Sequence, residues 1–403
     1  SAFNKKLRQA IKGKFGSTNV IINYFNKIDI SSNVYWFHAS SLGEFFQIKT
    51  VIEKLKEEKD DFTCIVSFSS PSGFNHANSD AMDLKFYIPF DFPWTINLVL
   101  NVIKPKKIMF ASYDLWPNLV WISHLKGIHV NLYSVKTKKS SFKNNQISRH
   151  IYRSIYSSLS SLYTISEKDM KDVCDILGSN PGPKLRVVGN PRYDLIMNEA
   201  REFRQNDVEN LIERDRRVII GSVHKKEEDF LVPALVQLMQ TNPGMKILYA
   251  LHEPTEFALK ETKKKFHDHG IVGVVFRKKT DLKLPNNPLV ILGVVGVLSK
   301  LYWQGQIAYV GGGHSTGVHN VMEPAVARLP VIFGPRYHNS HEAEKLIINN
   351  GGFSVADGQE FLSIIKTLIS DSNYHKMTSL SASDVVYKNV GSTREMVQQI
   401  FCD

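Results

Sequence analysis

The sequence predicts an α/β protein built from two doubly wound, mostly parallel sheets. Three observations lead to this prediction: the length of 403 residues, the alternation of short apolar runs with helical patterns, and one long polar interruption near the middle. Such a chain exceeds the usual size of a single core, so two domains of roughly 150 to 200 residues are expected. Near-continuous β-branched runs with helical crossovers are typical of parallel strands buried on both faces.

The first domain is predicted to span residues 1–195. Helical patterns separate most of its apolar runs, for example the stretch EFFQIKTVIEKLKEE that begins at Glu44. The expected strands are residues 34–40, 62–70, 85–89, 106–112, 129–135, 162–166 and 185–190.

Residues 196–216 are polar, helical and free of strands, so they are predicted to link the domains. A second α/β series follows over residues 217–382. Residues 383–403 are predicted to form one terminal helix that packs back on the first domain. The expected strands of the second domain are residues 217–223, 246–251, 271–277, 289–295, 307–312, 329–335 and 352–356.

Composition narrows the range of partners. The net charge of +11 suits an anionic membrane surface, a phosphorylated substrate or a nucleic acid. No Lys/Arg run resembles a nucleic-acid arm and the aromatic residues are scattered, so nucleic acid is not expected. The three cysteines, Cys64, Cys174 and Cys402, form no CxxC pair, which argues against a disulfide framework and fits a reducing cytoplasm.

No segment predicts a membrane span, because no run approaches the ~20 apolar residues that a transmembrane helix needs. No signal peptide is visible either. The opening SAFNKKLRQAIKGKFG is basic and weakly amphipathic. It fits a segment that lies on a membrane surface, and it fits a solvated first helix equally well.

Two doubly wound domains joined end to end leave a cleft, and ligands of such sheets bind at the carboxyl ends of the strands. The first strand is followed by HASSLGEF, in which Ser41 and Gly43 allow a tight turn and Glu44 falls in the first helical turn. A carboxylate there interacts favourably with the helix dipole. It can also serve as a general base for an attacking hydroxyl group, so both interpretations stay open.

Three other strand ends of the first domain carry polar candidates. Ser70 in SFSSPSGF can cap a helix or donate to a polar ligand. In ASYDLWPNL, Asp114 beside Trp116 is either a cleft carboxylate next to an aromatic wall or an ordinary N-cap. In VVGNPRYD, Arg192 and Asp194 fall at the domain junction, where a hinge or substrate contact and a plain interdomain ion pair are both plausible, and Asn190 precedes them as a cleft candidate.

The second domain repeats the arrangement of strand, small residues and polar groups. In GSVHKKEED, Ser222 and His224 precede a helix whose N-terminus can hold an anion. The next strand runs into HEPTEF, which places His252 in a turn.

The most informative stretch is YVGGGHSTGVHNVMEPA, residues 309–325. Glycines let the backbone approach a phosphate closely, and a helix that begins near residues 319–323 would supply N–H donors. The stretch is neither a Rossmann Gly-x-Gly-x-x-Gly nor a Walker A loop, because it follows a late strand and no Gly-Lys-Ser/Thr follows. A nucleotide cradle fits best, with Glu323 accepting hydrogen bonds from ribose hydroxyls.

A metal is not expected at this stretch, because His314 and His319 have no carboxylate at zinc-ligand spacing. The next strand end, FGPRYHNSHEAEKL, places Arg336, His338 and Asn339 where they can reach the same ligand.

Five stretches resemble, in order and spacing, the 3-deoxy-D-manno-octulosonic acid (Kdo) transferases of lipopolysaccharide assembly. They are WFHASSLGEF, DLWPN, VVGNPRYD, GSVHKKEE and GGGHSTGVHNVMEPAVARLPVIFGP, within residues from about 34 to 350. The block HN-x-x-E-P with the following PV-x-x-GP is the most specific part. A related block occurs across GT-B glycosyltransferases, and the SLGE element narrows the choice.

The resemblance implies a GT-B fold, with two Rossmann-like doubly wound domains facing each other across a cleft. It implies inverting transfer of Kdo from CMP-Kdo to a lipid A precursor, lipid IVA, without a metal or other cofactor. It also implies work at the cytoplasmic face of the bacterial inner membrane, where a basic surface would suit an anionic, phosphorylated glycolipid. The family's N-terminal hydrophobic anchor lies before the point where this chain begins.

The resemblance also assigns roles to single residues. Glu44 matches the glutamate of the SLGE element and would be the general base. Glu323 would bind the ribose, and Arg192 keeps the positive charge of the family's GN-x-K-x-D. The backbone around Gly312, Gly313, His319 and Asn320 would hold the CMP phosphate. The other donor-side candidates are Ser222, His224, His252, Gly311 and Arg336, and the acceptor or cleft candidates are Ser41, Gly43, Ser70, Asp114, Trp116, Asn190 and Arg192.

The chain departs from the family pattern at three places. Ser112-Tyr113-Asp114 stands where many members have Glu-Thr-Glu, so the first carboxylate is missing. GVVGVL at residues 293–298 stands where the family often has Asp-Thr-x-Gly-Glu-Leu, and Ser134-Val135-Lys136 replaces Asn-Ala-Arg. Two alternatives therefore remain: another GT-B enzyme that uses a UDP-sugar for a cell-envelope acceptor, and a catalytically silent nucleotide-sugar-binding protein.

Overall fold

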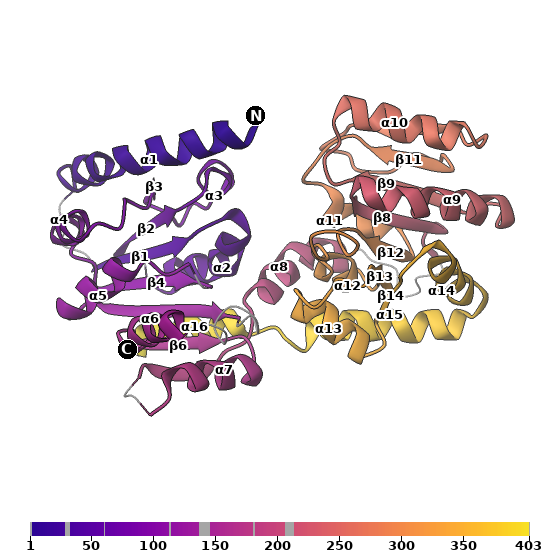
Figure 1. Ribbon diagram of the computed structural model, residues 1–403. Helices are drawn as coiled ribbons and strands as arrows, with labels where there is room; N and C mark the ends of the chain where they lie inside the picture. The colour runs from indigo at the N-terminus through magenta and orange to yellow at the C-terminus, as the bar shows by residue number, and fades with distance from the viewer. Residues whose placement is uncertain are drawn as a thin grey trace. The chain divides into compact units, whose positions relative to one another are not determined.

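The computed structural model describes residues 2–28, 33–59, 61–112, 114–136, 146–179, 182–205 and 213–402. Tyr113 and residues 206–212 of the predicted linker lie outside the described residues. The chain divides into two compact units (Figure 1). The first unit comprises residues 1–195 and 390–403, and the second comprises residues 196–389.

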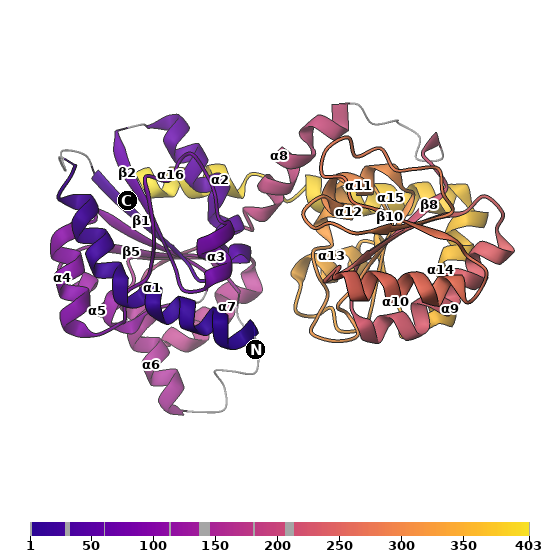
Figure 2. The same ribbon diagram turned by 90° about the horizontal axis from the view of Figure 1, so that it is seen from above.

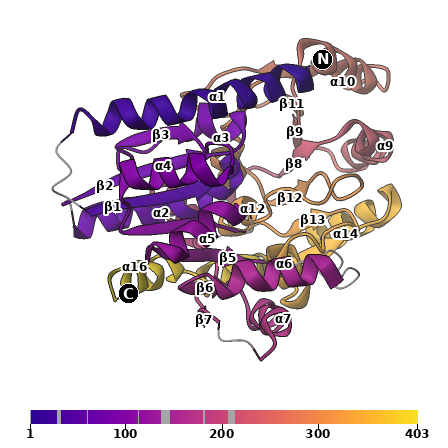
Figure 3. The ribbon, with the colours of Figure 1, turned by 60° about the vertical axis from the view of Figure 1, so that its left-hand side comes forward.

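The first unit contains one seven-stranded sheet whose strand pairs are all parallel. Its strand order is β3-β2-β1-β4-β5-β6-β7 (Figure 3). All seven predicted strands are confirmed. Their bounds are β1 Asn33–Ala39, β2 Phe62–Phe68, β3 Leu84–Tyr87, β4 Lys107–Ala111, β5 His129–Val135, β6 Ser161–Thr164 and β7 Lys184–Val187.

Helices cover both faces of this sheet (Figure 2). Because alternate strand residues point to opposite faces, Trp36 packs in one apolar core and Phe37 in the other. The helices of the Trp36 face are α1 Ala2–Phe25, α4 Pro93–Ile103, α5 Pro117–Leu125, α6 Gln146–Ser157 and α7 Glu167–Leu177. Those of the other face are α2 Leu42–Glu58, α3 Pro71–His76 and α16 Ser392–Cys402.

The second unit has the same architecture, with the strand order β10-β11-β9-β8-β12-β13-β14 and parallel pairing throughout. All seven predicted strands are again confirmed. Their bounds are β8 Arg217–Val223, β9 Lys246–Leu251, β10 Gly273–Phe276, β11 Leu289–Leu292, β12 Ile307–Val310, β13 Val331–Phe333 and β14 Gly352–Ser354.

Two apolar cores flank the second sheet as well. The helices whose buried residues fill the larger core are α9 Lys225–Thr241, α10 Glu256–His267 and α14 Gly358–Ser370. The remaining helices are α8 Arg192–Gln205, α11 Leu298–Leu301, α12 Met322–Val326, α13 His341–Ile348 and α15 Ser372–Tyr387. The predicted linker thus begins inside α8, a helix that starts in the first unit and continues into the second.

The prediction of one terminal helix over residues 383–403 is wrong. Helix α15 ends at Tyr387 in the second unit, and α16 begins at Ser392 in the first unit. Gly391 between them has a φ of +109°, which favours glycine and ends helical geometry. The carboxylate of Asp194 accepts the backbone N–H groups of Gly391 (2.7 Å) and Thr393 (3.0 Å), so it fixes the start of α16.

Each sheet reverses its winding at one place. In the first sheet β2 and β3 lie to one side of β1 and β4 to the other, and in the second sheet β9 and β12 flank β8. The crossovers diverge at such a switch point and leave a crevice at the carboxyl ends of the strands. Residues that follow β1 and β4, and those that follow β8 and β12, are therefore in position to bind ligands.

Candidate functional site

Glu44 lies in the first turn of α2, directly after β1. Ser41 is the N-cap of this helix, and its hydroxyl oxygen accepts the backbone N–H of Glu44 at 3.4 Å. The carboxylate of Glu44 in turn accepts the backbone N–H of Ser40 at 2.5 Å and the hydroxyl group of Ser40. These contacts hold the carboxylate at the switch point of the first sheet.

Burial raises the pKa of Glu44 above its ordinary value, and the negative charge of Asp114 raises it further. The hydrogen bonds from Ser40 act in the opposite direction but do not cancel the effect of burial. A carboxylate with a raised pKa accepts a proton more readily than an exposed one. The geometry therefore suits proton abstraction, in addition to the helix-dipole interaction.

Asp114 follows β4, the neighbour of β1, and is the end of a chain of hydrogen bonds. Trp36 Nε1–H donates to Ser67 Oγ (2.8 Å), and Ser67 Oγ lies 2.8 Å from His38 Nδ1. His38 Nε2 lies 3.2 Å from Asp114 Oδ2. One set of protons satisfies every group: the Ser67 hydroxyl donates to Nδ1, and Nε2–H donates to the carboxylate.

This chain fixes Asp114 in its ionised form. Burial opposes ionisation, but the hydrogen bonds from His38 and Ser69 outweigh it and hold the pKa of Asp114 below its ordinary value. The Ser69 hydroxyl donates to the same carboxylate oxygen at 2.8 Å. The ring of Trp116 lies 6.4 Å from the ring of His38 between centroids, and the Lys14 ammonium lies 4.0 Å from the centre of the Trp116 ring.

Not all acceptor-side candidates gather at this point. Ser70 caps α3, its oxygen accepting the N–H of Gly73 at 3.3 Å, which agrees with the capping alternative. Asn190 and Arg192 follow β7, and β4, β5 and β6 lie between β7 and β1. Asn190 Oδ1 accepts the backbone N–H of Arg192 at 3.1 Å and so shapes the start of α8.

In the second unit the glycine stretch is organised by a buried carboxylate, that of Glu227. It accepts the N–H of Gly312 (3.0 Å), the N–H of His224 (2.9 Å) and the hydroxyl group of Tyr309 (3.0 Å). Burial alone would raise the pKa of Glu227, but these bonds, with one from His314, lower it below the ordinary value. One carboxylate thus ties the start of α9 to the loop after β12.

The three glycines are needed for close approach of backbone segments. A Cβ atom on Gly311 would lie 2.3 Å from the carbonyl oxygen of Ser222, and one on Gly313 would lie 2.5 Å from the nitrogen of Gly334. Gly312 has a φ of +92°. Ser222 itself has a φ of +56°, a left-handed conformation that is uncommon for serine.

Two of the four residues predicted to hold the phosphate through their backbone, Gly312 and His319, have their N–H groups bonded elsewhere. The N–H of Gly312 donates to Glu227, and the N–H of His319 donates to the carbonyl oxygen of Gly311 at 3.1 Å. These two N–H groups are therefore already bonded within the protein. The glycines shape the loop, while the side chains that follow it face the space at the strand ends.

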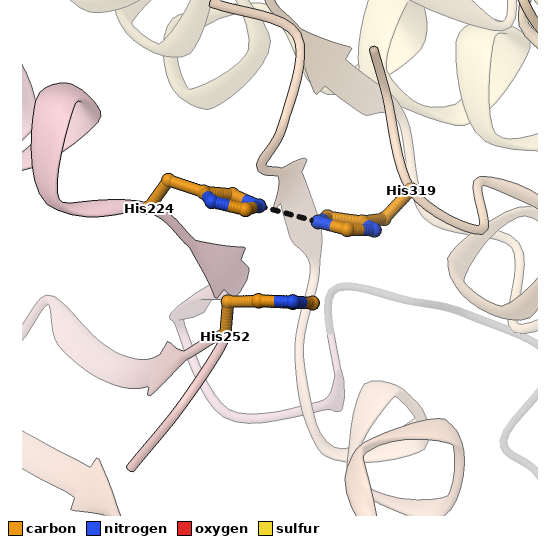
Figure 4. A group of neighbouring side chains, drawn as sticks. All are labelled: His224, His252 and His319. Carbon is orange, nitrogen blue, oxygen red and sulfur yellow. Dashed lines mark hydrogen bonds between the residues drawn. The ribbon is translucent and has the colours of Figure 1, made fainter. Parts of the chain in front are cut away.

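Three of those side chains are the imidazoles of His224, His252 and His319 (Figure 4). His224 Nε2 lies 2.7 Å from His319 Nε2, and the ring of His252 stacks against both at centroid distances of 4.4 and 4.5 Å. Burial lowers the pKa of His252, and it lowers that of His319 to about 4, with the neighbouring histidines adding to both effects. Both rings are therefore neutral at pH 7.

Glu323 lies in the first turn of α12, a helix of five residues that begins within the predicted region. Asn320 Nδ2 donates to Glu323 Oε1 at 2.8 Å. Glu323 lines a cavity of about 360 Å³. The wall also includes Gly296, Ser299, Lys300 and Trp303, so the turn that departs from the family pattern adjoins the same cavity.

Of the three residues after β13 that were expected near the glycine stretch, two lie there. Arg336 Nη1–H donates to the carbonyl oxygen of Ser315 (2.8 Å), and Asn339 packs against Gly317, so both contact the glycine stretch. His338 does not join them, because its Nδ1 lies 3.0 Å from Glu344 on α13. No feature of the sequence separates His338 from its neighbours, because only the loop geometry does so.

The sequence reasoning did not single out His38, Ser40, Ser67 and Ser69, and it gave Glu227 no role in the site. His38 is buried in a β-strand, where a histidine usually has a structural role. Glu227 occupies a position typical of a helix cap. Both residues could have been recognised as parts of a polar network, because a buried polar group must have hydrogen-bond partners.

Solved structures share the fold. The chain superposes on UDP-GlcNAc 2-epimerase from Neisseria meningitidis with a TM-score of 0.63 at 12% identity, covering 92% of this chain and 100% of that one. It superposes on a glycosyltransferase from Rickettsia africae with a TM-score of 0.60 at 12% identity, covering 92% and 99%. With two parallel seven-stranded sheets, the architecture is that of the GT-B class, as predicted.

Comparison with related sequences indicates which kind of GT-B protein the chain resembles. Residues 9–195 match the family model of 3-deoxy-D-manno-octulosonic-acid transferase (kdotransferase). The Kdo transferase of Haemophilus influenzae is 24% identical over 90% of this chain and 85% of the relative, and that of Chlamydia muridarum is 26% identical over 91% and 84%. That of Aquifex aeolicus is 24% identical over 87% and 91%. These comparisons support the Kdo transferase family for this chain, and its relatives are glycosyltransferases.

Proposed function

We propose that this protein is an inverting, metal-independent transferase that moves Kdo from CMP-Kdo to a lipid A precursor, lipid IVA. The observation that carries the proposal is the position of Glu44. Its carboxylate is half-buried at the switch point of the first sheet, has a raised pKa and is oriented by Ser40. These are the properties of a general base.

In the proposed step, Glu44 takes the proton of the acceptor hydroxyl group while its oxygen attacks the anomeric carbon of Kdo. The new bond joins that carbon to the acceptor oxygen. The bond from the anomeric carbon to the phosphate oxygen breaks, and CMP leaves with the electron pair. Attack on the side opposite to the leaving group inverts the configuration, and the step requires no metal.

The donor is proposed to bind to the second unit. His224, His319 and Arg336 lie around the ends of β8 and β12, where they can donate hydrogen bonds to the phosphate of CMP or the carboxylate of Kdo. Glu323 can accept hydrogen bonds from the ribose hydroxyls. The cavity of about 360 Å³ beside it supports binding of the nucleoside, since its wall combines the ring of Trp303 with polar groups.

The acceptor is proposed to be reached at an anionic membrane surface, the cytoplasmic face of the inner membrane. Large apolar side chains are exposed on two helices of the first unit that pack against each other: Leu7, Ile11 and Phe15 on α1 and Trp94 and Leu98 on α4. Lys6, Arg8 and Lys12 are on α1 as well. Exposed apolar side chains beside basic ones support peripheral contact of this surface with an anionic membrane. None of the described helices is long and apolar enough to cross a membrane.

The test is transfer itself. The protein would be incubated with freshly prepared CMP-Kdo and lipid IVA, and the lipid examined by mass spectrometry. A mass increase of one or more Kdo units is expected. No product with CMP-Kdo but product with a UDP-sugar would replace the proposed donor, and no product with either, while CMP raises the melting temperature, would favour a silent binding protein.

The matched variants are Glu44→Gln and Glu57→Gln, both on α2. Glu44→Gln is expected to lower the turnover number by about 10² to 10⁴-fold, the usual contribution of a general base. Glu57 is exposed and contacts Lys54, so Glu57→Gln should retain full activity. Unimpaired transfer by Glu44→Gln would refute the assignment of the base.

A further inference from the structure

The three histidines at the donor side come from three strands that are neighbours in the sheet. His252 follows β9, His224 follows β8 and His319 lies in the loop after β12, and the sheet order is β9-β8-β12. Their side chains meet beyond the carboxyl ends of these strands (Figure 4). Nitrogen atoms of the three rings, one from each, all lie within 4.8 Å of one another.

We propose that His224, His252 and His319 form a binding site for a divalent transition-metal ion such as Zn²⁺. Imidazole nitrogen is a preferred ligand of zinc, copper and nickel. Three histidines that leave a fourth position open are a recurring zinc ligand set. This set is not the one considered from sequence spacing, which paired His319 with His314.

Binding an ion requires the ring of His252 to rotate out of its stack on the other two rings, while His224 and His319 shift only slightly. Zinc–nitrogen bonds of about 2.0–2.1 Å in a tetrahedral site place the ligand nitrogens about 3.3 Å apart. The two Nε2 atoms of His224 and His319 are 2.7 Å apart, so they would separate slightly and exchange their mutual hydrogen bond for metal bonds. The third nitrogen would move inward from within 4.8 Å, which side-chain rotation of the exposed His252 allows.

The backbone at all three positions is fixed by hydrogen bonds. The N–H of His252 donates to Val223 O (2.9 Å), that of His319 to Gly311 O (3.1 Å) and that of His224 to the Glu227 carboxylate (2.9 Å). Glu227 also holds Gly312, in the loop that carries His319. Ligands on a fixed backbone lose little freedom when they bind an ion.

The charge around the cluster favours a cation. The buried carboxylate of Glu227 accepts the backbone N–H of His224 at 2.9 Å, and Glu253 directly follows His252 in the chain. His224 and His252 also line a cavity of about 450 Å³, which gives an ion a path to the cluster. The proposal does not rest on the proposed transfer reaction, because that step needs no ion and ion binding is measured without donor or acceptor. An ion held by His224 and His319 would compete with the donor for these two side chains.

The experiment is a titration of the full chain, free of any affinity tag, with Co²⁺ followed by visible absorption and with Zn²⁺ against a chromophoric chelator. One ion per chain is expected, with the visible bands of cobalt in a low-coordinate nitrogen site. His252→Ala and His319→Gln should each weaken binding by about 10-fold or more. The matched control is His269→Ala, since His269 is exposed at the end of α10 and should not affect binding.

His252→Ala is the decisive variant, because this side chain is exposed and its removal leaves the core intact. Unchanged affinity in His252→Ala and His319→Gln, or an equal loss in His269→Ala, would overturn the proposal. So would the absence of bound ion at 100-fold excess over protein. If the protein binds Zn²⁺ but does not transfer Kdo, the metal site stands and the proposed function fails. If it transfers Kdo but does not bind Zn²⁺, the proposed function stands and the metal site fails.

Discussion

Both carboxylate oxygens of Glu227 lie 3.0 Å from the backbone nitrogen of Gly312, a residue 85 positions later in the sequence. The same carboxylate accepts the N–H of His224. The ends of two neighbouring strands, β8 and β12, are therefore joined by one buried charge. The side chains of His224 and His319 owe their proximity to this junction.

Replacing Glu227 by Gln should destabilise the second unit by about 2 kcal/mol at pH 7, because hydrogen bonds to a charged group contribute about 1.5–3 kcal/mol. The pKa of Glu227 is lowered in the folded state. Its stabilisation is thus present above the unfolded pKa and is lost as the pH falls through the folded value. Urea unfolding at several pH values would measure both effects.

The control for this prediction is Glu261→Gln, since Glu261 is partly exposed on α10 and its carboxylate lies 3.6 Å from the exposed Lys225. An exposed pair of this kind contributes about 0–1 kcal/mol. Equal urea midpoints for the wild type and Glu227→Gln, or a difference that grows rather than shrinks below pH 4.5, would contradict the assigned role.

Gly311→Ala is expected to destabilise the protein by about 1–3 kcal/mol, the range for overpacking. The added Cβ would lie 2.3 Å from the carbonyl oxygen of Ser222, which cannot rotate away. Gly270→Ala is the comparison: Gly270 has a φ of +79° but open space around it, so only backbone strain is introduced. Thermal unfolding should show a loss for both variants, and weaker binding of CMP only for Gly311→Ala.

The strands were predictable because the pattern that indicates a strand lies within a few consecutive residues. A parallel strand buried on both faces is a short apolar run between polar segments, and all 14 expected strands are present in the described residues. The break between α15 and α16 was missed although Gly391 marks it, because both sides of the glycine have helical patterns. The position of Glu44 after β1 was predictable for the same local reason.

The contacts within the sites were less predictable, because they join strands that are distant in sequence. The bond between His38 and Asp114 spans 76 residues, and that between His224 and His319 spans 95. The spacing of single histidines along the chain carries no information about such contacts. The strand order supplies it, since β1 neighbours β4 and β8 neighbours both β9 and β12.

The pH dependence of the transfer rate should reveal the pKa of Glu44. The base acts when it is deprotonated, so the rate falls as the pH drops through the pKa of Glu44, which lies above 4.5. The negative charge of Asp114 contributes to this raised pKa. In Asp114→Asn the acidic limb of the kcat/KM profile should therefore move to lower pH, and a limb that stays in place would show that the two carboxylates do not interact.

The final prediction concerns the exposed apolar surface of α1 and α4. Phe15 is 72% exposed and Trp94 is 71% exposed, while Phe15 also contacts Phe90 at a ring-centroid distance of 4.8 Å. If these rings insert at a membrane surface, Phe15→Ala and Trp94→Ala should each weaken binding to vesicles, because burying a large apolar side chain contributes about 1.5–3 kcal/mol. Co-sedimentation with vesicles that contain anionic lipid measures the loss.

The matched control is Phe257→Ala, since Phe257 is 69% exposed but belongs to α10 of the second unit. It should bind vesicles like the wild type. Raising the salt concentration should weaken binding of every variant, because the lysines of α1 act through screened charge. Equal losses for Phe257→Ala and Trp94→Ala would mean that exposure alone, rather than the surface formed by α1 and α4, determines the attachment.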